Sequence, residues 1–301
     1  MNFERYRLPL KYINNFPYPD YFIDQNVYDA IKWTPQEDDL IVATYPKCGT
    51  TWIQAIVWSL QHFGDWPMPR FNNMMIRETP FIECIGPKAA DALRPPRHLK
   101  THHPFHLTPY SPKAKYITIV REPKDVCVSY FHFCRQLFEI NEVDVCTFDQ
   151  FFEEFMLGEV PYGDYYDHIL SWYAHKDDEN VLFLVYEQMI KDHVGHILKI
   201  AKFVSSEKCN YEHLILKDNA KLLRQICENT TFDSMKKVPV NNPCEFTDPN
   251  NVGERGKLID FFRKGVIGDW VNYFNAEQIR RIDQRTKEKF GDLVNTFGWK
   301  I

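Results

Sequence analysis

The chain of 301 residues carries 36 Lys and Arg against 41 Asp and Glu, a formal net charge of −5. This balance excludes a whole-protein basic footprint for nucleic acid, so an anion site must come from a local group of cations. Hydrophobic residues make up 44% and aromatic residues 15% of the sequence, which excludes a disordered chain and allows a sizeable core.

The sequence gives no sign of export or of a membrane span. The N-terminal MNFERYRLPL carries Glu and Arg where a secretory signal needs an apolar run. No segment approaches the roughly 18 consecutive apolar residues of a transmembrane helix. The eight cysteines are irregularly spaced and form no Cys-x-x-Cys pair, so we expect reduced thiols in a cytoplasmic protein, with neither disulfides nor a zinc site.

Short apolar runs alternate with segments of helical period along the chain. Strands are expected at 40–43, 98–100, 116–120 and 181–185. Helices are expected from about Thr50, from Pro123, and over about 187–204, 211–226 and 276–290. This alternation predicts an α/β fold in a single domain over 1–301, with a mostly parallel central sheet flanked by helices.

Four chemically active side chains follow these four strands. Lys47, His102, Arg121 and Tyr186 each lie just past the carboxyl end of one strand. Ligands of open α/β sheets bind at that edge. We therefore expect these side chains to meet in one site.

The segment Thr44-Tyr45-Pro46-Lys47-Cys48-Gly49-Thr50-Thr51-Trp52 joins the first strand to the first helix. Such a loop offers backbone N–H groups and a helix N-terminus to an anion, and Lys47 adds a full charge. Gly49 allows a close backbone approach, and the two threonines add hydroxyl donors. An ordinary β–α turn with a capping threonine is the alternative interpretation. The Lys precedes the Gly, which differs from the GxxxxGK[ST] loop of nucleotide kinases.

The same segment resembles the 5′-phosphosulfate loop of the cytosolic sulfotransferases, a P-loop-like element. The resemblance runs in order from about Phe16 to Gly265. It is carried by Lys100-Thr101-His102, the run from Arg121 to Ser129, Tyr186-Glu187, the run from Thr230 to Met235, and Arg263-Lys264-Gly265. Together these motifs imply transfer of a sulfuryl group from 3′-phosphoadenosine 5′-phosphosulfate (PAPS) to a small molecule. The nucleotide product is adenosine 3′,5′-bisphosphate (PAP), and no metal takes part.

The resemblance also implies residue roles in the donor site. The 5′-phosphosulfate would be held by Lys47, Cys48, Gly49, Thr50, Thr51 and Trp52, with Trp52 stacking on adenine. The 3′-phosphate would be held by Arg121 and Ser129 and closed off by Phe261, Arg263, Lys264 and Gly265. The adenosine would be lined by Tyr186, Thr230, Phe232 and Met235. Arg121 and Ser129 are eight residues apart across a turn and a helix start, so both can reach one phosphate, and the pair Arg263-Lys264 beside a glycine suits an anion clamp.

His102 is the expected general base, because imidazole accepts a hydroxyl proton near neutral pH. The motif Lys-Thr-His favours His102 over His103. Sequence spacing alone does not distinguish these two adjacent histidines. Lys47 would neutralise the bridging oxygen and Lys100 would assist at the sulfuryl oxygens during in-line attack. Ser129 would restrain Lys47, as in the family.

A metal site is the competing interpretation of the histidines. His98, His102, His103 and His106 are clustered, but Pro104 and Pro109 break any helix that could align them. No Cys or carboxylate completes the set, so we expect no metal.

Two departures from the family pattern carry predictions. Cys48 stands where the family usually has Ser, and its position beside cations and a helix N-terminus favours a reactive thiolate and oxidative inhibition. The usual dimer motif is Lys-x-x-x-Thr-Val-x-x-x-Glu, and the matching positions here are Val271, Asn275, Ala276 and Arg280. We therefore expect a monomer, or a dimer formed through a different contact.

The acceptor side is the least specific part of the sequence. Its expected residues are Phe16, Phe81, Lys100, His102, Phe138 and Tyr162. Aromatic walls suit phenols, steroids or aromatic amines, although such rings are also ordinary core residues. The partner is thus a small-molecule acceptor, with neither nucleic acid nor a membrane involved. Three other functions stay open: a nucleotide kinase or NTPase, a secretory-pathway sulfotransferase, and a carrier that binds the nucleotide without turnover.

Overall fold

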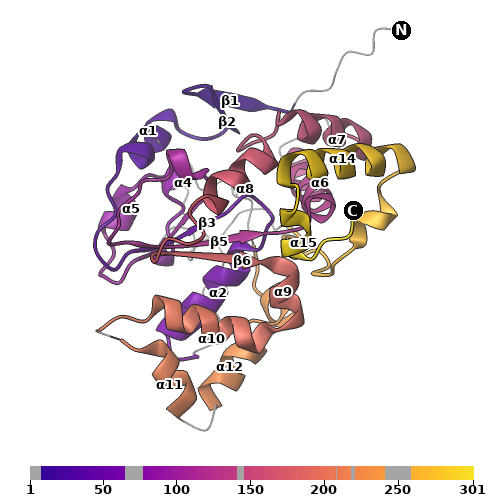
Figure 1. The fold of residues 1–301 in the computed structure, drawn as a ribbon. Coiled ribbons are helices and arrows are strands. Elements are labelled where there is room, and N and C mark those ends of the chain that lie inside the picture. The colour runs from indigo at the N-terminus through magenta and orange to yellow at the C-terminus, as the bar shows by residue number, and fades with distance from the viewer. Residues whose placement is uncertain (1–7, 65–76, 141–145, 208, 218–220, 241–258) are drawn as a thin grey trace.

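A four-stranded parallel sheet in the order β4-β3-β5-β6 forms the centre of the structure (Figure 1). The computed structural model describes residues 8–64, 77–140, 146–207, 209–217, 221–240 and 259–301, and at 138–140 it describes only the backbone. The strands of this sheet are β3 (Leu40–Ala43), β4 (His98–Thr101), β5 (Lys115–Val120) and β6 (Val181–Val185). All four predicted strands are present, and the prediction of a parallel sheet is confirmed.

The sheet is buried on both faces, which explains the continuous apolar runs. Every residue of Leu-Ile-Val-Ala in β3 is buried, as parallel strands covered by helices require. Strand β3 pairs with β4 from Leu40↔His98 and with β5 from Leu40↔Lys115. The chain leaves β3 toward β4 and then returns to β5 on the other side of β3. This reversal makes the carboxyl end of β3 a topological switch point, where open sheets bind ligands.

Helices cover both faces of the sheet and extend beyond it. Before β5 the helices are α1 (Asp24–Lys32), α2 (Thr50–Gln61), α4 (Ile82–Ile85), α5 (Lys88–Asp91) and the 3₁₀ turn η2 (Phe105–Leu107). The helices that follow β5, as far as residue 204, are α6 (Pro123–Ile140), α7 (Phe148–Leu157), α8 (Tyr165–Tyr173), α9 (Tyr186–Lys191) and α10 (His193–Val204). The remainder are α11 (Tyr211–Lys217), α12 (Lys221–Asn229), α13 (Phe232–Lys236), the 3₁₀ turn η4 (Asp269–Asn272), α14 (Ala276–Phe290) and α15 (Leu293–Phe297). In Figure 1, α2, α10 and α12 lie below the sheet and α8 lies above it.

Two of the predicted helices are each described as two separate helices in the structure. The expected helix over 187–204 was wrong as one element, because Asp192 ends α9 and its carboxylate caps α10 by accepting from Gly195 N at 2.9 Å. The expected helix over 211–226 is described as α11 and α12, and 218–220 lie outside the described residues. The helix expected over 276–290 is confirmed as α14, which begins with a capping box between Asn275 and Gln278.

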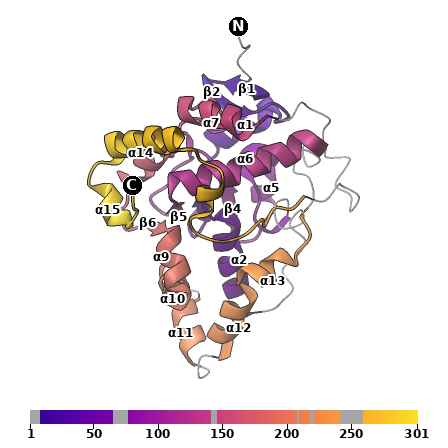
Figure 2. The same ribbon diagram turned by 90° about the vertical axis from the view of Figure 1, so that its right-hand side faces the viewer.

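An antiparallel hairpin of β1 (Leu10–Ile13) and β2 (Phe16–Pro19) lies above the sheet together with α1 (Figure 1). The sequence reading did not identify this hairpin. Its strands have only four residues each, and Pro17 and Pro19 interrupt the usual strand pattern. A quarter turn shows α10, α11 and α12 projecting away from the hairpin, at the opposite end of the molecule (Figure 2).

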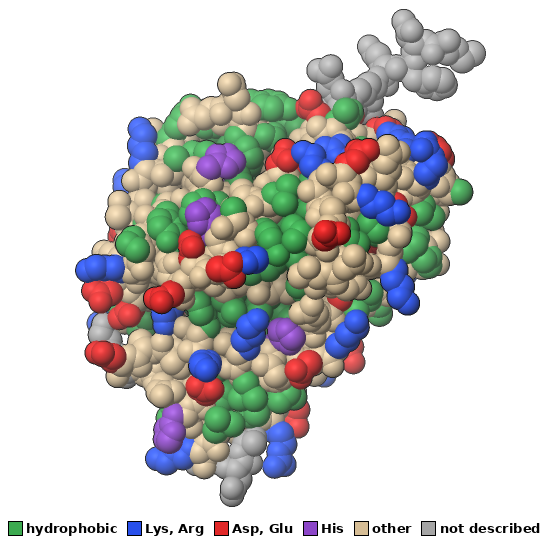
Figure 3. Space-filling view, viewed as in Figure 1, with side chains coloured by type: hydrophobic (Ala, Val, Ile, Leu, Met, Phe, Trp, Pro, Cys, Tyr) green, Lys and Arg blue, Asp and Glu red, His purple; other side chains and the backbone are tan. Residues whose placement is uncertain are grey.

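The surface mixes both signs of charge. On the face shown in Figure 3, Lys and Arg side chains are interspersed with Asp and Glu, and no continuous basic stripe crosses it. Among the described helices none is both long and apolar enough to cross a membrane.

The amino end of the sheet is held by a buried ion pair. Asp39 and Arg97 directly precede β3 and β4, and their side chains are 0% and 1% exposed. Arg97 donates from Nε to Asp39 Oδ1 at 2.7 Å and from Nη2 to Oδ2 at 2.6 Å. This bidentate pair stabilises the edge opposite the predicted site.

We expect Asp39→Asn to lower the free energy of unfolding by about 3 kcal/mol, because the buried Arg97 guanidinium loses its bidentate partner and keeps only the partly exposed Asp91 carboxylate, 3.2 Å from Nη1. Urea unfolding followed by circular dichroism measures this. The matched control is Glu37→Gln: Glu37 lies 3.9 Å from Lys113 with both side chains more than two-thirds exposed, and its loss should cost less than about 0.5 kcal/mol. If the two variants lowered the free energy of unfolding equally, the stabilising role of the Asp39–Arg97 pair would be contradicted.

Candidate functional site

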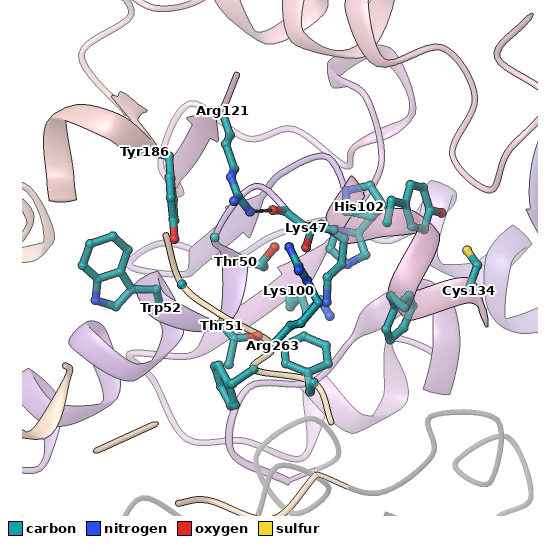
Figure 4. A pocket seen from close by; sticks show the side chains of 18 of the residues that line it. Lys47, Thr50, Thr51, Trp52, Lys100, His102, Arg121, Cys134, Tyr186 and Arg263 are labelled. Atoms are coloured by element: carbon teal, nitrogen blue, oxygen red, sulfur yellow. Dashed lines mark hydrogen bonds between the residues drawn. The ribbon is translucent and has the colours of Figure 1, made fainter. Parts of the chain in front are cut away.

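A cavity of about 550 Å³ opens at the carboxyl edge of the sheet and is lined by residues that follow all four strands. Figure 4 shows Trp52 and Tyr186 at one end and His102 and Cys134 at the other, with Lys47 and Lys100 between them. The predicted donor-site residues that line it are Lys47, Gly49, Thr50, Thr51, Trp52, Arg121, Ser129, Tyr186, Thr230, Phe232, Met235, Phe261, Arg263, Lys264 and Gly265. The predicted acceptor-side residues that line it are Phe81, Lys100, His102 and Tyr162.

The loop after β3 takes a strained path around the cavity. Lys47 has φ +66° and Gly49 has φ +119°, both in the region that L side chains rarely adopt. A Cβ on Gly49 would lie 3.1 Å from the Tyr186 ring and 3.3 Å from Ile119. Glycine is therefore required there for both conformation and space. The Thr50 hydroxyl lies 2.5 Å from that of Thr44, which fixes the start of α2.

Cations gather in this cavity with little counter-charge. Burial, then the nearby charges of Lys100 and Arg121, lower the pKa of Lys47 to about 7. Burial lowers the pKa of Lys100 to about 8. Asp20 is the only carboxylate among the described residues that line the cavity, and it is exposed. A buried ammonium group whose pKa is lowered by neighbouring cations suits a cavity that receives an anion.

The Lys47 ammonium is held by aromatic rings. Its Nζ lies 3.7 Å from the centre of the Phe261 ring and 4.5 Å from that of Phe133. Within the described part of the chain it forms no hydrogen bond to Ser129, so the expected restraint is absent here, and the two rings hold the ammonium instead. Ser129 is half-buried on α6 and lines the same cavity.

Arg121 connects the ends of two strands. Its Nη1 donates to the carbonyl of Lys47 at 3.2 Å, and its guanidinium lies 4.5 Å from the centre of the Tyr186 ring. The Nε atom is buried without a hydrogen-bond partner. A buried unpaired donor costs free energy that an anionic oxygen can recover.

The segment 263–270 closes the cavity from the C-terminal side. Arg263 and Lys264 both pair with Asp269, at 2.5 and 2.7 Å. Asp125, at the start of α6, accepts from the backbone N of Gly268 at 2.7 Å and of Trp270 at 3.2 Å. These contacts tether the predicted anion clamp to the helix that carries Ser129.

His102 is held by two backbone hydrogen bonds. Glu83 Oε1 accepts from His102 N at 2.6 Å, and His102 Nδ1 lies 2.7 Å from the carbonyl of Thr44. A carbonyl only accepts, so Nδ1 carries the proton and Nε2 keeps its lone pair. Burial, then the charge of Lys100, hold the pKa of His102 well below its usual value. The ring is therefore a neutral base, packed edge-to-face on Phe81 and Tyr162, with 5.1 Å between centroids in each case.

Three sequence predictions need correction or lie beyond the structure. Cys48 is fully buried, and burial raises its pKa, so the predicted reactive thiolate is wrong. Phe16 does not line the cavity; its ring packs against Tyr18 and His103 on the hairpin side. The side chain of Phe138, at the end of α6, lies outside the described residues, as do 241–258 with Cys244.

The sequence analysis did not identify several residues of the site. Glu83, which lies behind the cavity wall and holds His102, and His193, which lines the cavity at the start of α10, carry no motif of their own. The apolar wall adds Pro19, Tyr21, Phe22, Tyr130, Phe133, Cys134 and Leu137. Helical period could have indicated part of this wall, because Ser129, Phe133 and Leu137 are spaced four residues apart on α6. Among the described residues, no group of three or more His, Cys, Asp or Glu is placed to hold a metal ion.

Comparison with known proteins identifies the class. The chain matches the family model of the sulfotransferase domain over residues 37–294, so it belongs to the sulfotransferase family and transfers a sulfuryl group. It is 33% identical over 299 residues to an amine sulfotransferase of Oryctolagus cuniculus, covering 97% of this chain and 95% of the relative. It is 35% identical over 261 residues to sulfotransferase 1E1 of Cavia porcellus, covering 84% and 83%.

Solved structures agree with this assignment. The mouse sulfotransferase SULT7A1 in complex with PAP aligns with a TM-score of 0.71 at 30% identity, covering 96% of this chain and 97% of the other. A retinol dehydratase in complex with retinol and PAP aligns with a TM-score of 0.65 at 25% identity, covering 89% and 85%.

The 263–270 segment gives a matched pair of variants. Gly265 and Gly268 both have positive φ, but a Cβ on Gly265 would lie 2.1 Å from the Phe232 ring, whereas one on Gly268 meets nothing within 4 Å. We expect Gly265→Ala to reduce sulfotransferase turnover at limiting donor by tenfold or more, and Gly268→Ala to cost only the backbone strain, about 1 kcal/mol of stability. Similar turnover in the two variants would show that the contact with Phe232 does not matter.

Proposed function

We propose that this chain, as a single domain over 1–301, transfers the sulfuryl group of PAPS to the hydroxyl or amine of a small aromatic or steroid-like acceptor and releases PAP. His102 acts as the general base. The enzyme works in the cytoplasm. The single observation that carries the proposal is the neutral His102 ring, which donates Nδ1–H to Thr44 and keeps Nε2 basic beside Lys47 and Lys100. The relatives' names, an amine sulfotransferase and a retinol-bound dehydratase, support hydroxyl and amine acceptors with apolar bodies.

The chemistry of the cavity fits the nucleotide donor. The buried Arg121 Nε lacks a partner, neighbouring cations lower the pKa of Lys47, and Gly265 lets the C-terminal segment pack directly against the Phe232 ring, where any Cβ would clash. The residues that would hold the 5′ side are Lys47, Gly49, Thr50, Thr51 and Trp52, whereas Cys48 is buried behind the loop and its N–H donates to the Tyr45 carbonyl at 3.4 Å. Those for the 3′-phosphate are Arg121, Ser129, Arg263, Lys264 and Gly265.

The bound donor supplies an activated sulfuryl group on a phosphate leaving group. The protein's residues supply positioning and charge. His102 Nε2 takes the acceptor proton, and the ammonium groups of Lys47 and Lys100 stabilise the oxygens that gain negative charge. Phe81 and Tyr162 pack on the His102 ring, hold its plane and keep water from the base.

The proposal includes a monomer, or a dimer that does not use the usual family contact. The usual dimer motif has Lys at the position of Val271 and Glu at the position of Arg280. Here Val271 is 61% exposed, and Arg280 pairs with Glu277 of its own helix.

The test of function is turnover of PAPS against phenols, steroids, fatty alcohols and aromatic amines. We expect sulfated product from at least one class, and we expect His102→Gln to reduce kcat by about 10²–10⁴-fold while PAP still binds, because the general base is lost. His106→Gln, at an exposed histidine four residues away, serves as the control and should match the parent enzyme. Near-normal turnover in His102→Gln would sink the general-base assignment.

The lysine pKa values predict a pH-dependent affinity for PAP. The anion binds the protonated site, so affinity should fall as pH rises through about 7, where Lys47 loses its proton, and again through about 8 for Lys100. Calorimetry in buffers of different ionisation enthalpy should show proton uptake on binding at pH 8. In Lys47→Arg, whose guanidinium stays charged, the fall near pH 7 should disappear. If the affinity for PAP did not change between pH 6.5 and 8.5, this electrostatic account would be contradicted.

A further inference from the structure

His193 lies in the cavity but belongs to none of the motifs above. It is the first residue of α10, directly after the break at Asp192, and it lines the cavity at the end that holds Trp52. Its ring centre is 5.2 Å from that of Trp52, with 46° between the planes. An imidazole thus flanks the indole on which the adenine is expected to stack.

Hydrogen bonds fix the tautomer of this histidine. The Thr230 hydroxyl donates to the carbonyl of Ile226 at 2.7 Å, so its hydrogen is already committed. Thr230 Oγ1 also lies 3.1 Å from His193 Nε2, and in that contact it must accept. Nε2 therefore carries the proton, and Nδ1 has the lone pair.

The same threonine also fixes the indole. Trp52 Nε1 donates to the backbone carbonyl of Thr230 at 2.9 Å. Thr230 thus holds both rings and has no hydroxyl hydrogen left for a ligand. His193 Nδ1 has no hydrogen-bond partner among the described residues and is not a buried atom, and the residue itself lines the cavity. It is an acceptor held in place at the edge of an aromatic platform.

We propose that His193 Nδ1 accepts a hydrogen bond from the exocyclic amine of the donor's adenine and so selects adenine over other purines. This inference rests on the proposed function, since it concerns the nucleotide of the same site. Adenine carries a donor amine at position 6, whereas hypoxanthine carries an oxygen there that only accepts. Facing Nδ1, hypoxanthine brings two acceptors together and leaves both unpaired, which costs more than one lost hydrogen bond.

The test compares dissociation constants of PAP and of inosine 3′,5′-bisphosphate for the whole chain by calorimetry. We expect the parent protein to favour the adenine nucleotide by about tenfold. His193→Phe keeps a flat ring beside Trp52 but has no acceptor, and the preference should fall to about twofold or less. His193→Asn carries an acceptor oxygen near the position of Nδ1 and should recover much of the preference. His196→Ala, on the same helix but outside the cavity lining, is the control and should leave the ratio unchanged.

The outcomes separate this inference from the function on which it rests. An equal preference in the parent protein and in His193→Phe, or no preference in the parent protein, would overturn the role of His193 while PAP binding and sulfuryl transfer stand. Equal weakening of both nucleotides in His193→Phe would mean that the ring only packs against Trp52, which also overturns it. Failure of the parent protein to bind either nucleotide would instead refute the donor site itself.

Discussion

The hydrogen bond from His102 Nδ1 to the carbonyl of Thr44 is the contact on which the site depends. It exists because β3 and β4 pair in register, with Ala43 opposite Thr101, so the next residues of the two strands meet. Thr44 N continues the ladder by donating to the Thr101 carbonyl at 3.2 Å. The sheet therefore sets the tautomer of the base, and the basic nitrogen is a consequence of strand register.

The same edge concentrates positive charge where water is scarce. Lys47, Lys100 and Arg121 come from three adjacent strands, and burial makes each cation costly without an anion. The protein accepts this cost through aromatic rings under the ammonium groups and through the Arg121 bond to the Lys47 carbonyl. An anionic ligand thus binds to a site already arranged for it, as transition-state stabilisation by preorganised charge requires.

The sequence predicted the sheet and its edge well because buried parallel strands are continuous apolar runs, and because reactive residues follow all four of them. It predicted less well what depends on packing. The thiolate at Cys48 was wrong because spacing beside cations does not reveal full burial. Phe16 faces His103 from a hairpin whose prolines hide its strands, and the role of Glu83 arises from a contact 19 residues along the chain. His193 has no motif, and only the fold brings it to Trp52.

The most direct measurement is ¹⁵N NMR of the histidine-labelled protein, with the His102 signals assigned by their loss in His102→Gln. The account predicts a neutral ring with the proton on Nδ1 at every pH from 5.5 to 8, because burial keeps its pKa low and Thr44 accepts from Nδ1. An imidazolium at pH 6.5, or a neutral ring with the proton on Nε2, would contradict it.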